Sequence, residues 1–359
     1  PIAVVGLSCC GGFGSHWTRY LKILRSRISC VTSNVFYNGT QIDYAELKDK
    51  LGFDSSYFGF NKKEIQLMHP KKRWLLMQCQ HLIEDYRNQR NTDVFHNTGV
   101  FLTISKESEL EIKDTLPDEV VYQNTGQMSH ILNEVFQLSG PSLQVEHECA
   151  SSFLAIEQAM QAIRTGVCDQ AIAGGLFLDL NIPRILALRY HSHSLSKKNK
   201  FTIFDSGSDG YLIGEGGGLI LLKPYQKAVA DGDFIWGLIH ACNNGFQSRK
   251  IGNFLNPEAL YPFLKKIIEA CPQSPKISYY EAGVTGNEFS DPVEVQGVSE
   301  SIEKLGIQQQ PCYIGSVKPL IGHLENASGI LSVIKTLLMM QYDFIPESPI
   351  QGVIQSRFK

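Results

Sequence analysis

The sequence predicts an α/β fold, and two observations support this. Strand-like apolar runs alternate with helical patterns through most of the 359 residues. No low-complexity linker or long run of charge divides the chain, which contains 43% hydrophobic and 19% charged residues. This composition is that of an ordinary globular protein with enough residues to bury a sizeable core.

The strands are expected at short apolar runs, namely residues 2–5, 99–102, 143–145, 170–173, 219–222 and 313–314. The helices are expected where apolar residues recur every three or four positions, namely residues 73–86, 151–165, 260–270 and 329–340. Gly166 is a plausible stop for the second helix, and Asp291-Pro292 is expected to open a further one. A boundary is expected near Pro224, where a strand ends and a polar segment begins.

Charge and composition exclude several function classes. A formal net charge of -3 leaves no basic excess for binding a nucleic acid. The best apolar run, ILSVIKTLLMM, is short and contains Lys335, so no membrane span is predicted. Nine scattered cysteines indicate reduced thiols and a cytoplasmic protein. No metal site is predicted, because the H-x-H of His191 and His193 lies in a polar stretch with no matching acidic cluster.

Cys149 lies where a strand is expected to run into a helix, within VEHECASSFLAIEQAM. A thiol at that junction would lie at a helix N-terminus, where free N–H groups and the helix dipole favour the thiolate. A buried structural cysteine is the ordinary alternative for a single thiol. The strand-to-helix context favours a nucleophile instead.

Two further segments deserve comparison with the cysteine. The glycines of FDSGSDGYLIGEGGGLILLKP indicate turns that need a positive φ, and a strand rather than a helix follows them, which argues against a phosphate cradle. In SVKPLIGHLENASG, Lys318 and His323 precede the last predicted helix. A single histidine is more often a satisfied polar residue than a catalyst, but the lysine and the glycine-containing loop favour a functional role here.

Together these segments resemble the β-ketoacyl synthase family of fatty-acid and polyketide synthesis. GPSLQVEHECASS resembles GPSxxVDTACSSS, and FDSGSDGYLIGEGGG resembles FDxxADGYVxGEGAG. IGSVKPLIGHLENASG resembles IGSVKSNIGHLEAASG, and FDSSYFGFNKKEIQLMHPKKRWLL resembles the family segment before MDPQQR. The resemblance extends along nearly the whole chain.

The resemblance implies a thiolase-like five-layer αβαβα fold of two pseudo-duplicated halves, expected at residues 1–225 and 226–359. It implies that Cys149 is the nucleophile and that Lys318 and His323 assist it, with Thr285, Asn287 and Phe204 as substrate-binding residues. The acyl substrate would arrive on the phosphopantetheine of an acyl carrier protein, and no bound metal or redox cofactor is implied. A homodimer or heterodimer that extends the central sheet is also expected. Lys71, Lys72 and Arg73 could contact an acidic carrier protein, but a solvated helix face is the favoured interpretation of these three residues.

The sequence departs from the family at three places. The family's AHGTGT falls on residues 282–287, so Gly283 stands where a catalytic histidine is expected. Beside the nucleophile, Glu148 replaces an alanine, His147 a threonine and Ala150 a serine. A carboxylate next to the thiol opposes thiolate formation. Family members also continue past this point into a glycine-rich strand, whereas the given sequence stops after SPIQGVIQSRFK.

Two functions therefore stay open. The first is a ketosynthase-family acyltransferase that loads a chain on Cys149 and condenses it poorly because Gly283 replaces a histidine. The second is a non-catalytic subunit resembling a chain-length factor, paired with an active ketosynthase. The altered histidine motif and Glu148 favour the second function, whereas retention of Cys149, Lys318 and His323 favours the first. The acyl chain and the pathway product are not determined by the sequence.

Overall fold

A computed structural model describes residues 1–37, 39–48, 53–88, 97–105, 128–179, 181–245, 257–271, 276–307, 312–348 and 354. Its core is a mixed six-stranded sheet with the strand order β5-β4-β6-β7-β1-β8. The strands are β1 (Ile2–Gly11), β4 (Thr98–Ile104), β5 (Ser142–Gln144), β6 (Gln170–Phe177), β7 (Gly216–Pro224) and β8 (Gly237–Ile239). Strands β4, β5 and β6 are parallel, whereas β7 runs antiparallel to both β6 and β1.

The central strands are buried on both faces, and their side chains alternate between two hydrophobic cores. Along β1, one core takes Ile2, Val4, Leu7 and Cys9, and the other takes Ala3, Val5 and Cys10. Each half of the strand keeps the ordinary alternation, and its phase switches near Gly6, where the pairing of β1 with β7 has a bulge or irregularity. Because both faces are covered, β1, β4 and β6 are buried at every position and are mostly apolar, rather than alternating between buried and exposed residues.

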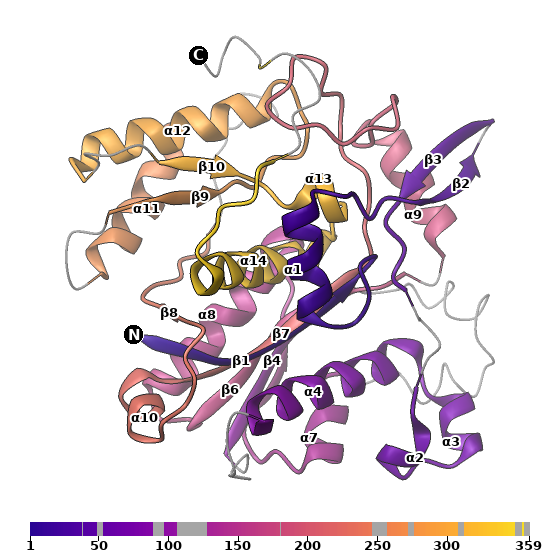
Figure 1. The fold of residues 1–359 in the computed structure, drawn as a ribbon, viewed down its shortest axis with the longest axis vertical. Coiled ribbons are helices and arrows are strands. Elements are labelled where there is room, and N and C mark those ends of the chain that lie inside the picture. The colour runs from indigo at the N-terminus through magenta and orange to yellow at the C-terminus, as the bar shows by residue number, and fades with distance from the viewer. Residues whose placement is uncertain are drawn as a thin grey trace.

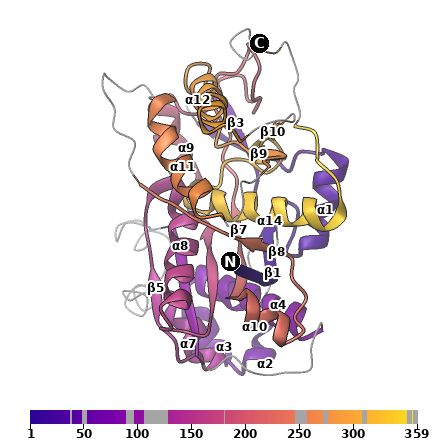
Figure 2. The ribbon, with the colours of Figure 1, turned by 90° about the vertical axis from the view of Figure 1, so that its left-hand side faces the viewer.

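Helices cover both faces of this sheet (Figures 1 and 2). On one face α8 (Ser151–Arg164) packs on β4 and β6, and α14 (Ser328–Tyr342) packs on β7. On the other face α4 (Pro70–Asn88) packs on β1 and β7 and is joined by α7 (His130–Phe136), while α10 (Tyr225–Ala230) contacts the same two strands. Helix α1 (Trp17–Ser26) lies against β1 and α14. The sheet thus forms a layer between two helical layers.

The remaining elements lie around this unit. Strands β9 (Tyr279–Glu281) and β10 (Tyr313–Gly315) form a parallel pair near α11 (Leu260–Glu269) and α12 (Ser290–Leu305), and β2 (Ser33–Tyr37) and β3 (Thr40–Tyr44) form a hairpin beside α9 (Ile182–His191) (Figure 1). The short helices are α2 (Ser55–Phe58), α3 (Lys62–Leu67), α13 (Lys318–Ile321), η1 (Glu148–Ala150), η2 (Pro257–Ala259) and η3 (Glu325–Ala327).

The structure confirms each strand and helix expected from the sequence and extends most of them. The run at 2–5 grows into β1 through Gly11, the run at 73–86 into α4, and the expected helix at Asp291-Pro292 is α12. Strand β8 lies beyond the expected boundary at residue 225 yet pairs with β1. The glycine-rich segment adopts positive φ at Gly210 and Gly216, as its turns require.

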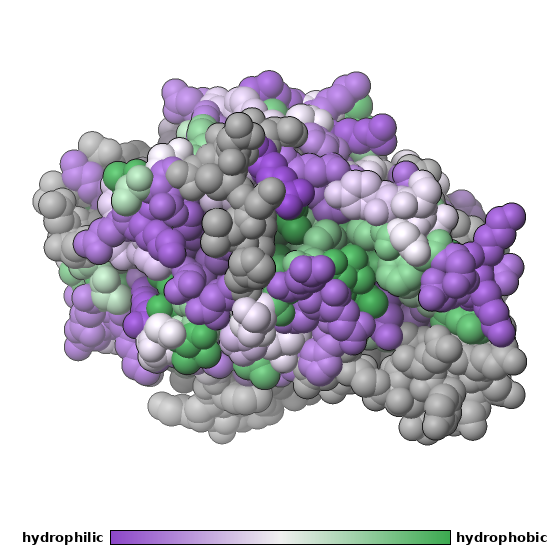
Figure 3. Space-filling model, turned by 90° about the horizontal axis from the view of Figure 1, so that it is seen from below, coloured by the Kyte–Doolittle hydropathy of each residue, from purple (hydrophilic) through white to green (hydrophobic). Residues whose placement is uncertain are grey.

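One candidate surface is corrected by the structure. Lys71 is buried, and its Nζ donates a 2.6 Å hydrogen bond to the carbonyl of Ser105. Arg73 donates twice to the carbonyl of Met68, at 3.1 and 2.8 Å. This cluster therefore anchors the start of α4 rather than forming a solvated helix face. Figure 3 shows the lower face of the molecule as largely hydrophilic, with apolar residues gathered near its middle. No helix in the described part of the chain could cross a membrane.

Candidate active site

Cys149 lies in η1, between the end of β5 and the first turn of α8. The preceding residue, Glu148, has a φ of 47°, a left-handed backbone conformation that costs free energy for a residue other than glycine. Ser151 Oγ accepts a hydrogen bond from the His147 backbone N–H at 2.6 Å and donates to the Glu148 carbonyl at 2.5 Å. These bonds hold the sharp turn that leaves Cys149 exposed.

His323 lies beside this thiol in the loop between α13 and η3, and Glu325 is the first residue of η3. The Cys149 Sγ, a His323 ring nitrogen and a Glu325 carboxylate oxygen all lie within 4.8 Å of one another. His323 is buried, with 2% of its surface exposed, and its ring lies against that of Tyr211 with the centroids 4.7 Å apart. The structure thus brings together the cysteine and the histidine that the sequence singled out separately.

The hydrogen bonding of His323 determines which of its two ring nitrogens carries the proton. Its Nδ1 accepts a 2.9 Å bond from the backbone N–H of Glu325. Burial, together with the charges of Lys318 and Arg189, holds the pKa of His323 well below the ordinary 6.5. The ring is therefore neutral with its proton on Nε2, and it can donate a hydrogen bond but is poorly suited to take a proton from the thiol.

The environment of Cys149 does not favour the thiolate, contrary to the expectation from its place before a helix. Desolvation by the surrounding protein, with the carboxylates of Glu325 and Glu148, raises the pKa of Cys149 to about 11. The nearby charges of Lys318 and Arg189 lower it but do not prevail. Desolvation and the two carboxylates therefore oppose the thiolate that the helix start was expected to favour.

A small polar network links α9 to the site, and sequence reasoning missed most of it. Arg189 Nη2 lies 2.8 Å from Glu325 Oε2, and the Tyr211 hydroxyl donates to Glu325 Oε1 at 3.1 Å. Glu325 and Tyr211 stand within the motifs that pointed to His323 and the glycine-rich turn, so their sequence positions carried a signal. Arg189 had no such context.

Lys318 is buried at the start of α13, and its ammonium group faces the loop at 282–287. Its Nζ donates to the Gly283 carbonyl at 2.6 Å and to the Val284 carbonyl at 3.3 Å. Burial lowers the pKa of Lys318, while neighbouring carboxylates and the Cys149 thiol oppose that shift. The ammonium group thus acts on the thiol through its charge and on the loop through hydrogen bonds.

The loop that carries Gly283 is held from both sides. The Gly283 N–H donates to Glu294 Oε1 at 2.6 Å, and Asp291 accepts from the N–H groups of Thr285 and Gly286 at 3.0 and 2.9 Å. Burial raises the pKa of Asp291 to about 6, although these backbone bonds oppose the shift. The loop is therefore rigidly supported although it lacks a histidine.

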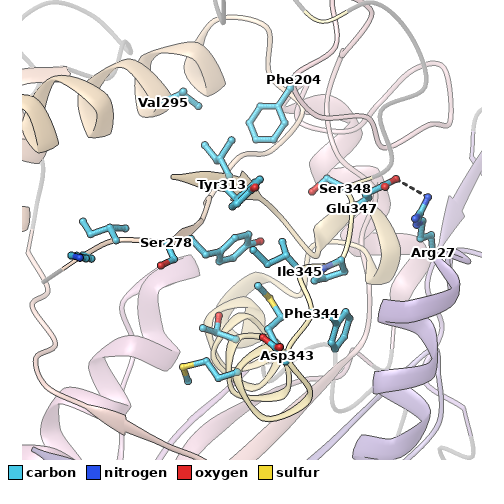
Figure 4. Close-up of a pocket in the computed structure, with 18 of the residues that line it drawn as sticks. Arg27, Phe204, Ser278, Val295, Tyr313, Asp343, Phe344, Ile345, Glu347 and Ser348 are labelled. Carbon is cyan, nitrogen blue, oxygen red and sulfur yellow. Dashed lines mark ion pairs between the residues drawn. The ribbon is translucent and has the colours of Figure 1, made fainter. Parts of the chain in front are cut away.

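The three expected substrate-binding residues occupy different surroundings. Thr285 is half-buried in the supported loop, and Asn287 uses its side-chain oxygen to accept from the N–H groups of Phe289 and Ser290 at the start of α12. Phe204 lines a groove of about 1540 Å³ with residues of β9, β10, α14 and the segment that follows it. Figure 4 shows Phe204 across this groove from Phe344 and Ile345, with Arg27 and Glu347 paired at 2.6 Å. The described residues that line the groove do not include Cys149, His323 or Lys318.

The thiol, imidazole and carboxylate are also the donor types of a metal site. Two observations argue against a cation there. Both Glu325 oxygens already accept hydrogen bonds, and the Arg189 guanidinium lies against one of them. The positive charge of Arg189 would therefore repel a metal cation bound at this site.

The fold is that of thiolase-like ketosynthases. Residues 1–228 match the family model for the β-ketoacyl synthase N-terminal domain, and residues 239–350 match that for the C-terminal domain. The chain therefore belongs to the β-ketoacyl synthase family.

Among curated proteins, the chain is 34% identical over 315 residues to polyketide synthase ThaG of Burkholderia thailandensis. It is 35% identical over 312 residues to polyketide synthase PksL of Bacillus subtilis. These matches cover 84% and 82% of this chain but only 6% and 7% of those proteins.

Among solved structures, it is similar to the ketosynthase from module 6 of the bacillaene synthase of Bacillus subtilis, with a TM-score of 0.86 and 25% identity. It also resembles the oxazolomycin ketosynthase domain of Streptomyces albus, with a TM-score of 0.84 and 26% identity. The matches cover 100% and 99% of this chain, and 64% and 66% of those structures.

Proposed function

We propose that the chain accepts an acyl group on Cys149 from a thioester carried on the phosphopantetheine of an acyl carrier protein. The observation that supports this most is the placement of an exposed thiol within 4.8 Å of a neutral, buried histidine. The proposal is consistent with the polyketide synthases and ketosynthase structures to which the chain is similar.

The proposed transfer starts with loss of the Cys149 proton to solvent. The thiolate attacks the thioester carbonyl carbon, an S–C bond forms, and the electron pair of the C=O bond moves to oxygen. Nε2–H of His323 is a donor for this oxyanion. When the C=O bond re-forms, the bond to the carrier sulfur breaks, and the departing thiolate takes a proton from solvent. The products are the acyl-enzyme and the free phosphopantetheine thiol.

Decarboxylative condensation requires more than acylation does. The enolate left when a malonyl unit loses carbon dioxide needs hydrogen-bond donors, and in condensing family members two histidines provide them. Gly283 has no side chain, and its N–H already donates to Glu294. Loss of one such donor raises the barrier by about 2.7–4 kcal/mol, so we propose that the chain extends acyl groups only slowly.

A second candidate function is a subunit without catalysis of its own, similar to a chain-length factor. It is favoured by the raised pKa of Cys149, which makes the reactive thiolate rarer at neutral pH than it is for an ordinary cysteine. In either case we propose a dimer. Strand β5 forms one edge of the six-stranded sheet, where pairing with a partner would extend it.

Intact mass spectrometry tests the first function against the second. The protein is incubated with acyl carrier proteins bearing acetyl, butanoyl or hexanoyl thioesters and compared with Cys149→Ala. Acyl transfer is supported if the parent protein gains the mass of the acyl group and Cys149→Ala does not. A folded protein that gains no adduct from any donor refutes it and supports the subunit function.

A further inference from the structure

One buried ion pair lies close to the candidate active site but has no part in the proposed acyl transfer. Lys335, on α14, is buried, and its Nζ lies 2.6 Å from Glu281 Oε2 at the end of β9. The same ammonium group donates to the Tyr279 hydroxyl at 2.7 Å, and that hydroxyl donates to Glu281 Oε2. Burying two opposite charges costs free energy that well-packed apolar side chains would not, so the pair calls for an explanation.

Glu281 connects this ion pair to the segment that carries Lys318. Its Oε1 accepts a 2.8 Å hydrogen bond from the backbone N–H of Val317, the residue before Lys318. Glu281 also comes two residues before Gly283, whose carbonyl accepts from Lys318 Nζ at 2.6 Å. One carboxylate is therefore bonded to the backbone beside Lys318 and belongs to the strand that leads into the loop bonded by its side chain.

The charge of Lys318 is shared between the thiol and Glu281. Burial raises the pKa of the Cys149 thiol, and the charge of Lys318 opposes this shift. Glu281 is one of the carboxylates that attract the same ammonium group. Because Lys335 lies against Glu281, the two opposite charges largely cancel at the position of Lys318. Without Lys335, the buried charge of Glu281 would compete with Cys149 for Lys318.

Two other carboxylates also attract Lys318, and they are held differently. Glu294 accepts from the N–H of Gly283, and Asp291 accepts from the N–H of Thr285. Both therefore serve the backbone of the loop. Glu281 is instead balanced by a full opposite charge, so a single substitution can change its influence on Lys318.

We propose that Lys335 is a positioning residue, which compensates Glu281 and so keeps the ammonium group of Lys318 available to the Cys149 thiol. This inference rests on the proposed function, because it concerns how the same site ionises its nucleophile. Lys335 acts through Glu281 and Lys318 rather than by contact with the thiol. Its effect on the thiol can be measured without any acyl donor.

The test measures alkylation of Cys149 by iodoacetamide at one fixed pH, with the modified peptide quantified by mass spectrometry. Lys335→Met is compared with Lys223→Met, which removes a buried ammonium group 2.6 Å from Asp231 near the end of β7. Each substitution takes the counter-charge from a carboxylate, so both should lower the midpoint of unfolding. Only the first changes the charge next to the segment that carries Lys318.

Lys335→Met should slow alkylation of Cys149 by about two- to three-fold, because less thiolate forms when Lys318 is drawn towards Glu281. Lys223→Met should leave the rate unchanged. The direction separates positioning from a merely structural role, since loosening of the fold would expose the thiol and speed its alkylation. If Lys335→Met does not fold, Lys335→Gln takes its place, because its amide removes the charge and still donates to Glu281.

A double-mutant cycle establishes the route of the effect. Lys318→Met alone should slow alkylation by about three- to ten-fold, since it removes the charge that favours the thiolate. Adding Lys335→Met to this variant should change the rate no further, because both substitutions then act on one interaction. Glu281→Gln/Lys335→Met has no unpaired charge at the ion pair and should return the rate to within about two-fold of the parent.

Alkylation that is unchanged or faster in Lys335→Met overturns the proposal. So does a further loss of the same size when Lys335→Met is added to Lys318→Met. Acylation by butanoyl-N-acetylcysteamine should fall by the same factor as alkylation, in kcat rather than in KM. A parent protein that shows the predicted alkylation pattern but is never acylated supports the positioning of Lys318 and refutes the proposed function.

Discussion

Restoring the missing histidine at Gly283 should restore condensation. A Cβ at this position would meet Glu294 Oε1 at 3.4 Å and Oε2 at 3.5 Å, which is ordinary van der Waals contact. Gly283 is exposed and its φ lies outside the left-handed region, so a side chain fits without backbone strain. The bonds from Gly283 to Glu294 and Lys318 use backbone atoms and survive the substitution.

The magnitude follows from the chemistry of the added donor. An imidazole N–H aimed at the developing enolate contributes about 2.7–4 kcal/mol, or roughly a hundred- to thousand-fold in rate. This is an upper bound, because the adjacent Glu294 carboxylate competes for the same N–H. We therefore expect Gly283→His to raise the rate of condensation by about ten- to a hundred-fold, below that bound.

The assay starts from protein already acylated on Cys149 and follows the β-ketoacyl product after malonyl carrier protein is added. Gly283→Ala is the matched control, since it fills the Cβ position without adding a donor. If Gly283→His acylates normally yet condenses no faster than Gly283→Ala, the absent histidine does not limit condensation and the reasoning fails.

Three further predictions concern the thiol and the support of the site. With the Cys149 pKa near 11, the rate of alkylation by iodoacetamide should rise about ten-fold per pH unit between about pH 7 and pH 10; a plateau above about pH 8 would contradict this. Glu148→Gln removes a charge that raises the thiol pKa, so alkylation at fixed pH should accelerate by about two- to three-fold, while Glu146→Gln should change it less. Lys335→Met removes the counter-charge that lies 2.6 Å from the Glu281 carboxylate, which keeps only the neutral donors Tyr279 and Val317, and should lower the free energy of unfolding by about 3 kcal/mol. Denaturant unfolding measures this last effect, and a loss below about 1 kcal/mol would refute it.

The fold was predictable because its signals are local. Strands β1, β4 and β6 are mostly apolar since both faces of the sheet are covered, and the spacing of apolar residues in α8 and α14 marks the sides that face the sheet. Cys149 and His323 were found because each lies in a recognisable loop-to-helix context. That the two residues lie close together could be expected only from the family resemblance, because no pattern within either segment indicates it.

The electrostatics of the site were not predictable in the same way. The expectation of a favoured thiolate considered only the helix after Cys149, whereas desolvation by the surrounding protein and the charge of Glu325, which is 176 residues away along the chain, raise the pKa. Arg189 and Lys71 illustrate the same limit. Arg189 pairs with Glu325 in the site, whereas Lys71 is buried and bonds the backbone carbonyl of Ser105. Nothing in the sequence next to either residue distinguishes these two outcomes.

One measurement tests the central claim most directly. The protein is mixed with butanoyl carrier protein and malonyl carrier protein together, and both the protein and the carriers are then analysed by mass spectrometry. The account predicts a butanoyl group on Cys149, absent in Cys149→Ala, with little or no β-ketoacyl carrier formed. Rapid formation of β-ketohexanoyl carrier would contradict the role given to Gly283, and an unmodified Cys149 would contradict acyl transfer itself.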